Sequence, residues 1–354
     1  MSDKQARRYF YLALGGALLF GASTPACKLL LSQVAPALLA GLLYFGSGLG
    51  LSTLWLVNKS LTKQHNREAA LTAADLPWLA GAIIFGGISA PLLLMYGLAR
   101  IAAADASLLL NLEGAFTALI AWFVFKENFD RRIALGMLSI FFGGIYLAYQ
   151  PAISLSLSYG ALAITLACLL WAIDNNCTRK ISAADPLQTS AVKGIVAGIV
   201  NLSLALVIGD KLPEWRFLLL ACVIGFLSYG VSLSLYIRAL RHLGAARTGA
   251  CFATAPFLGA LLSVTLLQEP ITFRFLMAGA LMAFGVWLHI TEKHSHEHTH
   301  EELEHEHMHM HDEHHRHEHE GSIPLTEPHS HRHRHERLTH SHPHFPDLHH
   351  QHKH

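Results

Sequence analysis

The amino-acid sequence predicts an all-α membrane protein, in which ten transmembrane helices form two inverted five-helix repeats and a disordered cytoplasmic tail follows. Hydrophobic residues make up 52% of the 354 residues and charged residues only 14%, whereas soluble domains average about 25% charged residues. Ten apolar stretches approach the roughly 20 residues that a membrane-spanning helix needs. A pattern that closes with Glu127 in the fourth stretch also recurs, closing with Glu269, 142 residues later (269 minus 127).

The ten stretches follow one another closely, and only the link at 58–77 is a loop of real length. They lack the polar face that a helix on the surface of a soluble protein needs, and Ala35–Val57 has no charged residue at all. A soluble helical protein is therefore excluded. The predicted spans are Tyr9–Leu31, Ala35–Val57, Trp78–Ala99, Ala103–Phe125, Ile133–Tyr149, Tyr159–Cys177, Leu187–Ile208, Phe217–Ile237, Leu243–Leu267 and Phe273–Ile290.

Lysine and arginine residues indicate how the chain is oriented, because cytoplasmic loops carry an excess of them. With the N-terminus placed in the cytoplasm, fifteen of these residues fall on the cytoplasmic side and five on the outer side. Ten spans then return the chain to the cytoplasm. We therefore expect a multi-pass protein of a bacterial inner membrane, in contact with the lipid bilayer, with both termini in the cytoplasm.

The recurring pattern relates Ala106–Glu127 in the fourth span to Gly249–Glu269 in the ninth. Each segment has small residues first, then a helix-breaking pair (Glu113-Gly114 in the first copy), an apolar run and a closing glutamate. Because each copy holds five spans, an odd number, the second copy crosses the membrane inverted. Inverted repeats are typical of transporters, which bind substrate near the midplane where the repeats meet. A membrane scaffold that transports nothing is the alternative.

Several features together resemble an EamA-type member of the drug/metabolite transporter superfamily. The closing glutamates are each followed by a basic residue and a glycine-rich span (Arg132 to Gly136, and Arg274 to Gly279), and the lead-ins ALLFGAS and CLLWAID also fit. The resemblance covers two repeats, at 9–149 and 159–291. It implies ten helices, a central cavity and, most often, the export of small metabolites.

The chain departs from the family pattern at two places. A basic residue is typical early in the second span of each repeat; Lys193 fits, but the first copy has Leu43-Tyr44 there. The usual proline of the fourth span is replaced by Glu113-Gly114. The substrate contacts of relatives therefore need not apply to this chain.

Glu113 is the candidate residue for coupling or substrate contact. It lies about ten residues into its span, roughly 15 Å deep at 1.5 Å per residue, which is near the midplane. An ionisable group at that depth is costly and by default marks a functional site, and a buried carboxylate can load and release a proton. Asn111 lies on a neighbouring face, and Gly114 would let another backbone approach or let the helix bend. A purely structural hydrogen bond is the alternative.

A second polar cluster lies in the inner third of the sixth span, at Asp174, Asn175 and Asn176. Lys193 lies about as deep in the seventh span. A short turn joins the two spans, so the sequence predicts a pair between Asp174 and Lys193. The pair is either a structural ion pair or part of a gate or substrate contact.

Residues 292–354 form a tail of a different composition, which holds 23 of the chain's 26 histidines and too few apolar residues for a core. We expect it to be disordered. Neutral imidazole suits zinc, nickel, cobalt and copper, and alternate residues of an extended chain share one side. The alternatives are that the tail senses pH or that it only keeps the protein soluble. The candidate ligands are His294, His296, His298, His300, His305, His307, His309, His311, His314, His315, His317, His319, His329, His331, His333 and His335.

These features together predict a secondary transporter that exports a small metabolite or drug-like solute and has a metal-binding regulatory tail. Efflux of a divalent metal ion or metal complex is the first alternative, and a metal-sensing scaffold without transport is the second. The sequence has no nucleotide-binding loop and no nucleophile constellation, so we expect no enzyme activity. No cofactor and no nucleic acid partner are expected, and a homodimer is possible on this basis.

Overall fold

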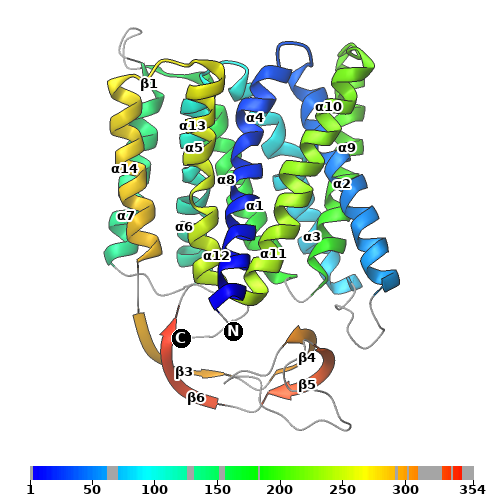
Figure 1. The fold of residues 1–354 in the computed structure, drawn as a ribbon, viewed down its shortest axis with the longest axis vertical. Helices are drawn as coiled ribbons and strands as arrows, with labels where there is room; N and C mark the ends of the chain where they lie inside the picture. The colour runs from blue at the N-terminus through cyan, green and yellow to red at the C-terminus, as the bar shows by residue number, and fades with distance from the viewer. Residues whose placement is uncertain are drawn as a thin grey trace.

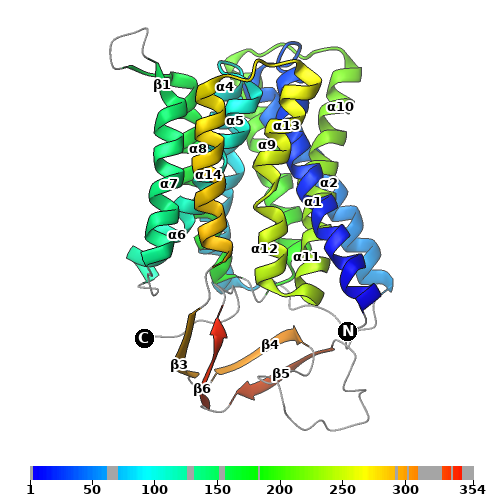
Figure 2. The same ribbon diagram turned by 60° about the vertical axis from the view of Figure 1, so that its left-hand side comes forward.

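The computed structural model describes residues 3–61, 71–125, 131–150, 156–181, 184–291, 294–300, 303–309, 329–335 and 338–344. Ten helical segments within these residues are long and apolar enough to cross a membrane, and they stand side by side in one bundle (Figure 1). The N-terminus lies at the lower end of the bundle in Figures 1 and 2. We call this end the N-terminal end and the other the opposite end.

The first repeat forms five spans, of which the third and fourth are composite. Its elements are α1 (Asp3–Leu30), α2 (Pro36–Leu61), η2 (Ala73–Asp75), α3 (Leu76–Ala82), η3 (Ile83–Ser89), α4 (Ala90–Leu98), α5 (Ala103–Leu109), α6 (Asn111–Phe125) and α7 (Arg131–Ala148). The third span comprises η2 to α4, and the fourth comprises α5 and α6.

The second repeat is built in the same way. Its elements are α8 (Tyr159–Lys180), α9 (Pro186–Ile208), α10 (Trp215–Gly225), η4 (Phe226–Val231), α11 (Ser232–Leu243), α12 (Ala245–Phe252), α13 (Ala255–Leu267) and α14 (Phe273–Ile290). Each of the ten predicted spans coincides with one described segment, and differences are confined to the ends. The prediction of an all-α protein with ten spans is therefore confirmed.

The helix irregularities recur in the two repeats. The third spans contain the π-helices η3 and η4, which begin at Ile83 and Phe226, and the fourth spans are interrupted after Leu109 and after Phe252. Both offsets are 143 residues (226 minus 83, and 252 minus 109). A π-helix or a break weakens the regular hydrogen-bond ladder of a helix. Because these irregularities recur at one offset, the two repeats share their backbone conformation and not only their pattern of hydropathy.

The first helix of each repeat packs into the other repeat. Helix α1 contacts α11, α12 and α13, whereas α8 contacts α3, η3, α4 and α6. Equivalent helices also pair across the molecule, α2 with α9 and α7 with α14. The two repeats are therefore intertwined, and any movement of one against the other must change the surroundings of α1 and α8.

Glycines let the central pair, α2 and α9, approach closely. A Cβ on Gly194 would lie 2.7 Å from Cα of Gly48, and a Cβ on Gly198 would lie 2.6 Å from Cα of Phe45. Small residues at such crossings let two helices pack backbone to backbone, which provides the van der Waals contact that drives association in lipid. The bundle thus has its tightest contacts where the two repeats meet.

Short strands lie outside the bundle. Strand β1 (Tyr149–Gln150) pairs with β2 (Ser156–Leu157) between the repeats. In the tail, the described backbone forms two antiparallel pairs, β3 (His294–His300) with β6 (Leu338–His344) and β4 (Leu303–His309) with β5 (His329–His335), and the predicted disorder of the tail stays a prediction. A two-stranded pair alone is marginally stable in water.

The crossing of α2 and α9 can be tested with Gly194→Ala. The added methyl group meets backbone rather than a flexible side chain, and overpacking of this kind costs about 1–3 kcal/mol. In detergent, the Gly194→Ala variant should therefore unfold at a lower temperature than the unchanged protein. Gly249→Ala in α12 is the control, because its Cβ would meet nothing within 4 Å and alanine favours helix by about 1 kcal/mol. Equal behaviour of the two variants would contradict the packing described above.

Candidate functional site

Glu113 lies just after the interruption of the fourth span. Helix α5 ends at Leu109, α6 begins at Asn111, and Glu113 stands in the first turn of α6. Its half-buried carboxylate accepts a hydrogen bond of 2.9 Å from the side-chain amide of Asn175. The same amide nitrogen lies 3.2 Å from the hydroxyl of Thr117. Because α6 belongs to the first repeat and α8 to the second, this contact joins the two repeats.

Gly114 is expected either to let another backbone approach or to let the helix bend. A Cβ at this position would meet nothing within 4 Å, so the first alternative does not hold, and the second stays a prediction. The pair Glu113-Gly114 also lies within α6 rather than at the interruption, which falls at Leu110. The open space beside Gly114 and the partial exposure of Glu113 leave this carboxylate accessible from one side.

Asp174 and Lys193 form the ion pair that the short turn between their spans predicts. The side chain of Asp174 is 5% exposed and that of Lys193 19%, so both charges are largely removed from solvent. The hydroxyl of Thr178 donates a 3.0 Å hydrogen bond to the second carboxylate oxygen of Asp174. Such a pair tolerates the loss of one partner poorly, because the other charge is then left buried and unpaired.

The π-helix η3 presents two backbone carbonyl groups to side chains of other helices. The carbonyl oxygen of Gly86 accepts hydrogen bonds from the Tyr44 hydroxyl (2.8 Å) and from the indole nitrogen of Trp171 (3.0 Å). The Gly87 carbonyl oxygen accepts one from the Asn201 amide (3.2 Å). Polar backbone groups freed at an irregular turn inside a membrane must find such partners.

Gly86 and Asp174 are also in direct contact, since a Cβ at Gly86 would overlap the Asp174 carboxylate. The ion pair and the π-helix therefore form one unit. Sequence reasoning missed Tyr44, Trp171 and Asn201 as parts of this unit. The only signal was the presence of Tyr44 at the place where the family pattern has a basic residue.

Asn111 and Asn176 serve the helix backbone. The buried Asn111 amide donates to the Leu108 carbonyl oxygen at 2.9 Å, beside the interruption of the fourth span, and lies 4.0 Å from the sulfur of Met282. The buried Asn176 amide donates to the Ala172 carbonyl oxygen at 2.8 Å and reaches that of Thr117 at 3.4 Å. Of the six predicted site residues, Glu113 and Asn175 are thus hydrogen-bonded to each other, and Asp174 and Lys193 form an ion pair. The side chains of Asn111 and Asn176 donate hydrogen bonds to backbone carbonyl groups.

At the opposite end, Glu269 caps the beginning of the fourth span. Its two carboxylate oxygens accept 2.7 Å hydrogen bonds from the backbone N–H groups of Ala103 and Ala104. The ammonium group of Lys28 donates 2.7 Å bonds to the carbonyl oxygens of Leu98 and Ile101 just before it. A carboxylate at a helix N-terminus satisfies free N–H groups and opposes the helix dipole. Glu269 therefore ties the second repeat to the first.

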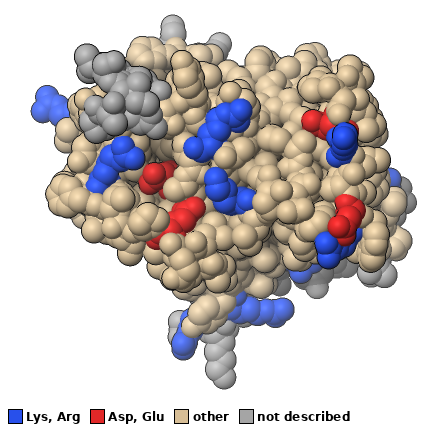
Figure 3. Space-filling model, turned by 90° about the horizontal axis from the view of Figure 1, so that it is seen from above, with Lys and Arg blue, Asp and Glu red and all other residues tan. Residues whose placement is uncertain are grey.

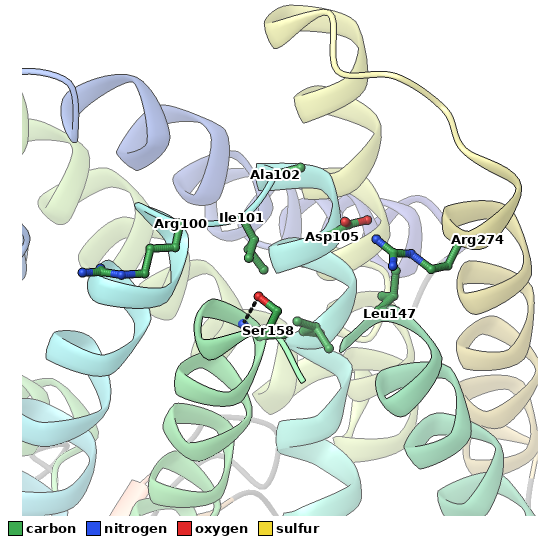
Figure 4. Close-up of a pocket in the computed structure, with 9 residues that line it drawn as sticks. Arg100, Ile101, Ala102, Asp105, Leu147, Ser158 and Arg274 are labelled. Carbon is green, nitrogen blue, oxygen red and sulfur yellow. Dashed lines mark hydrogen bonds between the residues drawn. The ribbon is translucent and has the colours of Figure 1, made fainter. Parts of the chain in front are cut away.

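Beside this cap lies a pocket of about 200 Å³. Figure 4 shows the Arg274 guanidinium directed toward the Asp105 carboxyl group, whereas Arg100 points away from it. Seen from this end, acidic and basic side chains gather in small mixed groups on a largely uncharged face (Figure 3). The Arg274 side chain also donates to the Tyr149 carbonyl oxygen at 2.7 Å, which connects α14 to β1.

The predicted metal ligands of the tail have side chains outside the described residues, so the metal site stays a prediction. Within the part of the chain whose side chains are described, no group of three or more His, Cys, Asp or Glu residues lies close enough to hold a metal ion.

Comparison with known proteins identifies the family. The model of the EamA-like transporter family matches residues 7–149 and again residues 158–291. An uncharacterized transporter of Methanothermobacter thermautotrophicus is 28% identical over 287 residues, which cover 77% of this chain and 82% of that protein. A crystal structure of a protein with 17% sequence identity superimposes with a TM-score of 0.55 over 79% of this chain and 95% of its own, which supports the fold alone. The chain therefore belongs to the EamA-like transporter family, as a multi-pass membrane transporter with two copies of the family domain.

Proposed function

We propose that this transporter exports a small metabolite or drug-like solute and that Glu113 contacts the substrate or couples its movement to protons. The observation that carries the proposal is the hydrogen bond between Glu113 and Asn175. It lies in the first helical turn after the interruption of the fourth span and joins one repeat to the other. Transporters of inverted repeats move substrate by rocking one repeat against the other around such a site, and this contact would change in that movement.

The surroundings of Glu113 support the same proposal. Its partner Asn175 directly follows Asp174, which is paired with Lys193, and the space beside Gly114 is open. A carboxylate that is accessible from one side and close to a charged pair can exchange a proton or an amine substrate as its surroundings change. We further propose a bacterial inner membrane, with the N-terminal end of the bundle in the cytoplasm, from the excess of lysine and arginine there.

Replacing Glu113 tests the coupling role. Glu113→Gln keeps the shape of the side chain and its bond to Asn175 but removes the titratable group. In proteoliposomes screened with candidate metabolites and metals, we expect transport to become independent of an imposed pH gradient, or to be lost. Normal transport by the variant at every pH would exclude Glu113 as the coupling residue.

A surface variant provides the control for this measurement. Glu214 pairs with Arg216 at the opposite end, and both side chains are more than 60% exposed. Exposed pairs of this kind contribute about 0–1 kcal/mol. Glu214→Gln should therefore transport like the unchanged protein, and a loss of transport in both variants would point to a general effect of removing acidic charge.

The Asp174–Lys193 pair is either a structural ion pair or part of a gate or substrate contact, and substitutions can distinguish the two. Asp174→Asn or Lys193→Met alone leaves a buried charge unpaired, which should cost about 3–5 kcal/mol and lower the thermal unfolding temperature. The double variant should recover most of that stability. If it also recovers transport, the pair is structural; if it is stable but inactive, the pair is part of the gate or the substrate contact.

We also propose that the histidine-rich tail binds divalent transition metals and regulates transport. In the described backbone, the register of β4 and β5 sets His305 opposite His333 and His307 opposite His331, and directly opposed residues share one face of an antiparallel pair. Efflux of the metal itself is the second candidate, which rests on the composition of the tail. A homodimer likewise stays a prediction.

Removal of the tail distinguishes regulation from metal delivery. Truncation after Lys293 should abolish zinc and nickel binding measured by calorimetry, and binding by the full chain should weaken below about pH 6.5 as imidazole becomes protonated. Regulation predicts that solute export continues but no longer responds to metal. A metal flux that falls together with binding would favour metal as the cargo, and unchanged zinc and nickel binding by the truncated chain would exclude the tail as the binding site.

A further inference from the structure

The two repeats form the same crevice twice, once at each end of the bundle. The pocket beside Asp105 lies between α5 of the first repeat and α8 of the second, and a second pocket lies between α12 of the second repeat and α1 of the first. Ile101 and Asp105 in one correspond to Leu243 and Arg247 in the other, with an offset of 142 residues in each case (243 minus 101, and 247 minus 105). The pockets are therefore equivalent by the internal symmetry.

The two crevices differ in size and in charge. The one at the N-terminal end encloses about 620 Å³, against about 200 Å³ at the opposite end. Arg247 stands where the other has Asp105, and Arg7 contributes a second guanidinium at the beginning of α1. Among the residues whose side chains the structure describes, no acidic one lines the larger crevice, and both arginines are exposed. It is therefore an electropositive site.

The walls of the larger crevice are apolar below the two arginines. Phe10 is 46% exposed and Tyr11 61% exposed, so the apolar wall of the crevice reaches the outer surface of the bundle. From Arg7 to Leu14 the helix rises seven residues, roughly 10 Å at 1.5 Å per residue. A positive end and an apolar wall of this depth match the headgroup and upper acyl chain of a lipid.

We propose that this crevice binds an anionic phospholipid, with its phosphate between Arg7 and Arg247 and an acyl chain along Phe10, Tyr11 and Leu14. Basic pockets between transmembrane helices bind the acidic headgroups of lipids. Free phosphate would leave the apolar volume unfilled, whereas a lipid occupies both parts. Because α1 and α12 come from different repeats, the bound lipid touches both and stabilises their present arrangement. The inference is independent of the transported solute.

The test uses the full chain in neutral detergent, titrated with phosphatidylglycerol or phosphatidylcholine. Bound lipid is counted by native mass spectrometry, and the unfolding temperature is measured in parallel. We expect phosphatidylglycerol to be preferred and to raise the unfolding temperature more. Each of Arg7→Gln and Arg247→Gln should lower the relative affinity for phosphatidylglycerol about fivefold, since one arginine near a headgroup contributes about that factor.

Two controls make the outcome decisive. Arg8→Gln removes the same charge from the neighbouring residue, which is exposed and does not line the crevice, so it should keep the preference. Glycerol 3-phosphate carries the phosphate without the acyl chains and should give no comparable rise in unfolding temperature. The proposal is overturned if Arg8→Gln acts like Arg7→Gln, if phosphatidylcholine binds equally well, or if glycerol 3-phosphate stabilises as strongly as the lipid.

Discussion

Every polar backbone group in the membrane interior needs a hydrogen-bond partner, and this constraint determines how the irregular helices of the protein are held. The π-helix of the third span exposes the carbonyl groups of Gly86 and Gly87, which side chains of α2, α8 and α9 satisfy. At the interruption of the fourth span, Asn111 donates to the Leu108 carbonyl group, and at the beginning of that span Glu269 caps the N–H groups of α5. Most of these partners come from the other repeat. An irregular span can thus persist only while the two repeats are packed together.

The intertwining of the repeats brings the candidate site and the structural contacts to the same place. Helix α8 lies among spans of the first repeat, and it carries Trp171, Asp174 and Asn175 to the π-helix and to Glu113. The contacts that hold the irregular helices are therefore also the contacts that a relative movement of the repeats must break and remake. Under the proposed function, a change at Glu113 would therefore alter the contacts between the two repeats.

Two of the residues discussed above, Glu113 and Asp105, are departures from the internal symmetry of the protein. Glu113 corresponds to Ala255 (255 minus 142), and Asp105 corresponds to Arg247. The backbone irregularities, in contrast, recur in both copies. Shared packing constrains the positions that hold the helices, whereas positions that face open space are free to differ. The open space beside Gly114 and the unequal crevices at the two ends are places of this second kind.

The sequence by itself determined the ten spans, because a span depends only on the length of a local apolar stretch. It also determined the inverted duplication, because each repeat holds an odd number of spans. It also predicted the Asp174–Lys193 pair, since a short turn limits where two deep charges can lie. Only the tertiary structure placed the interruption at Leu110, joined Glu113 to Asn175, and brought Tyr44, Trp171 and Asn201 to the π-helix. These contacts link residues far apart in the chain, and they depend on how intertwined repeats cross. Neither hydropathy nor residue spacing contains that crossing geometry, because it arises from close packing at glycines such as Gly48 and Gly194.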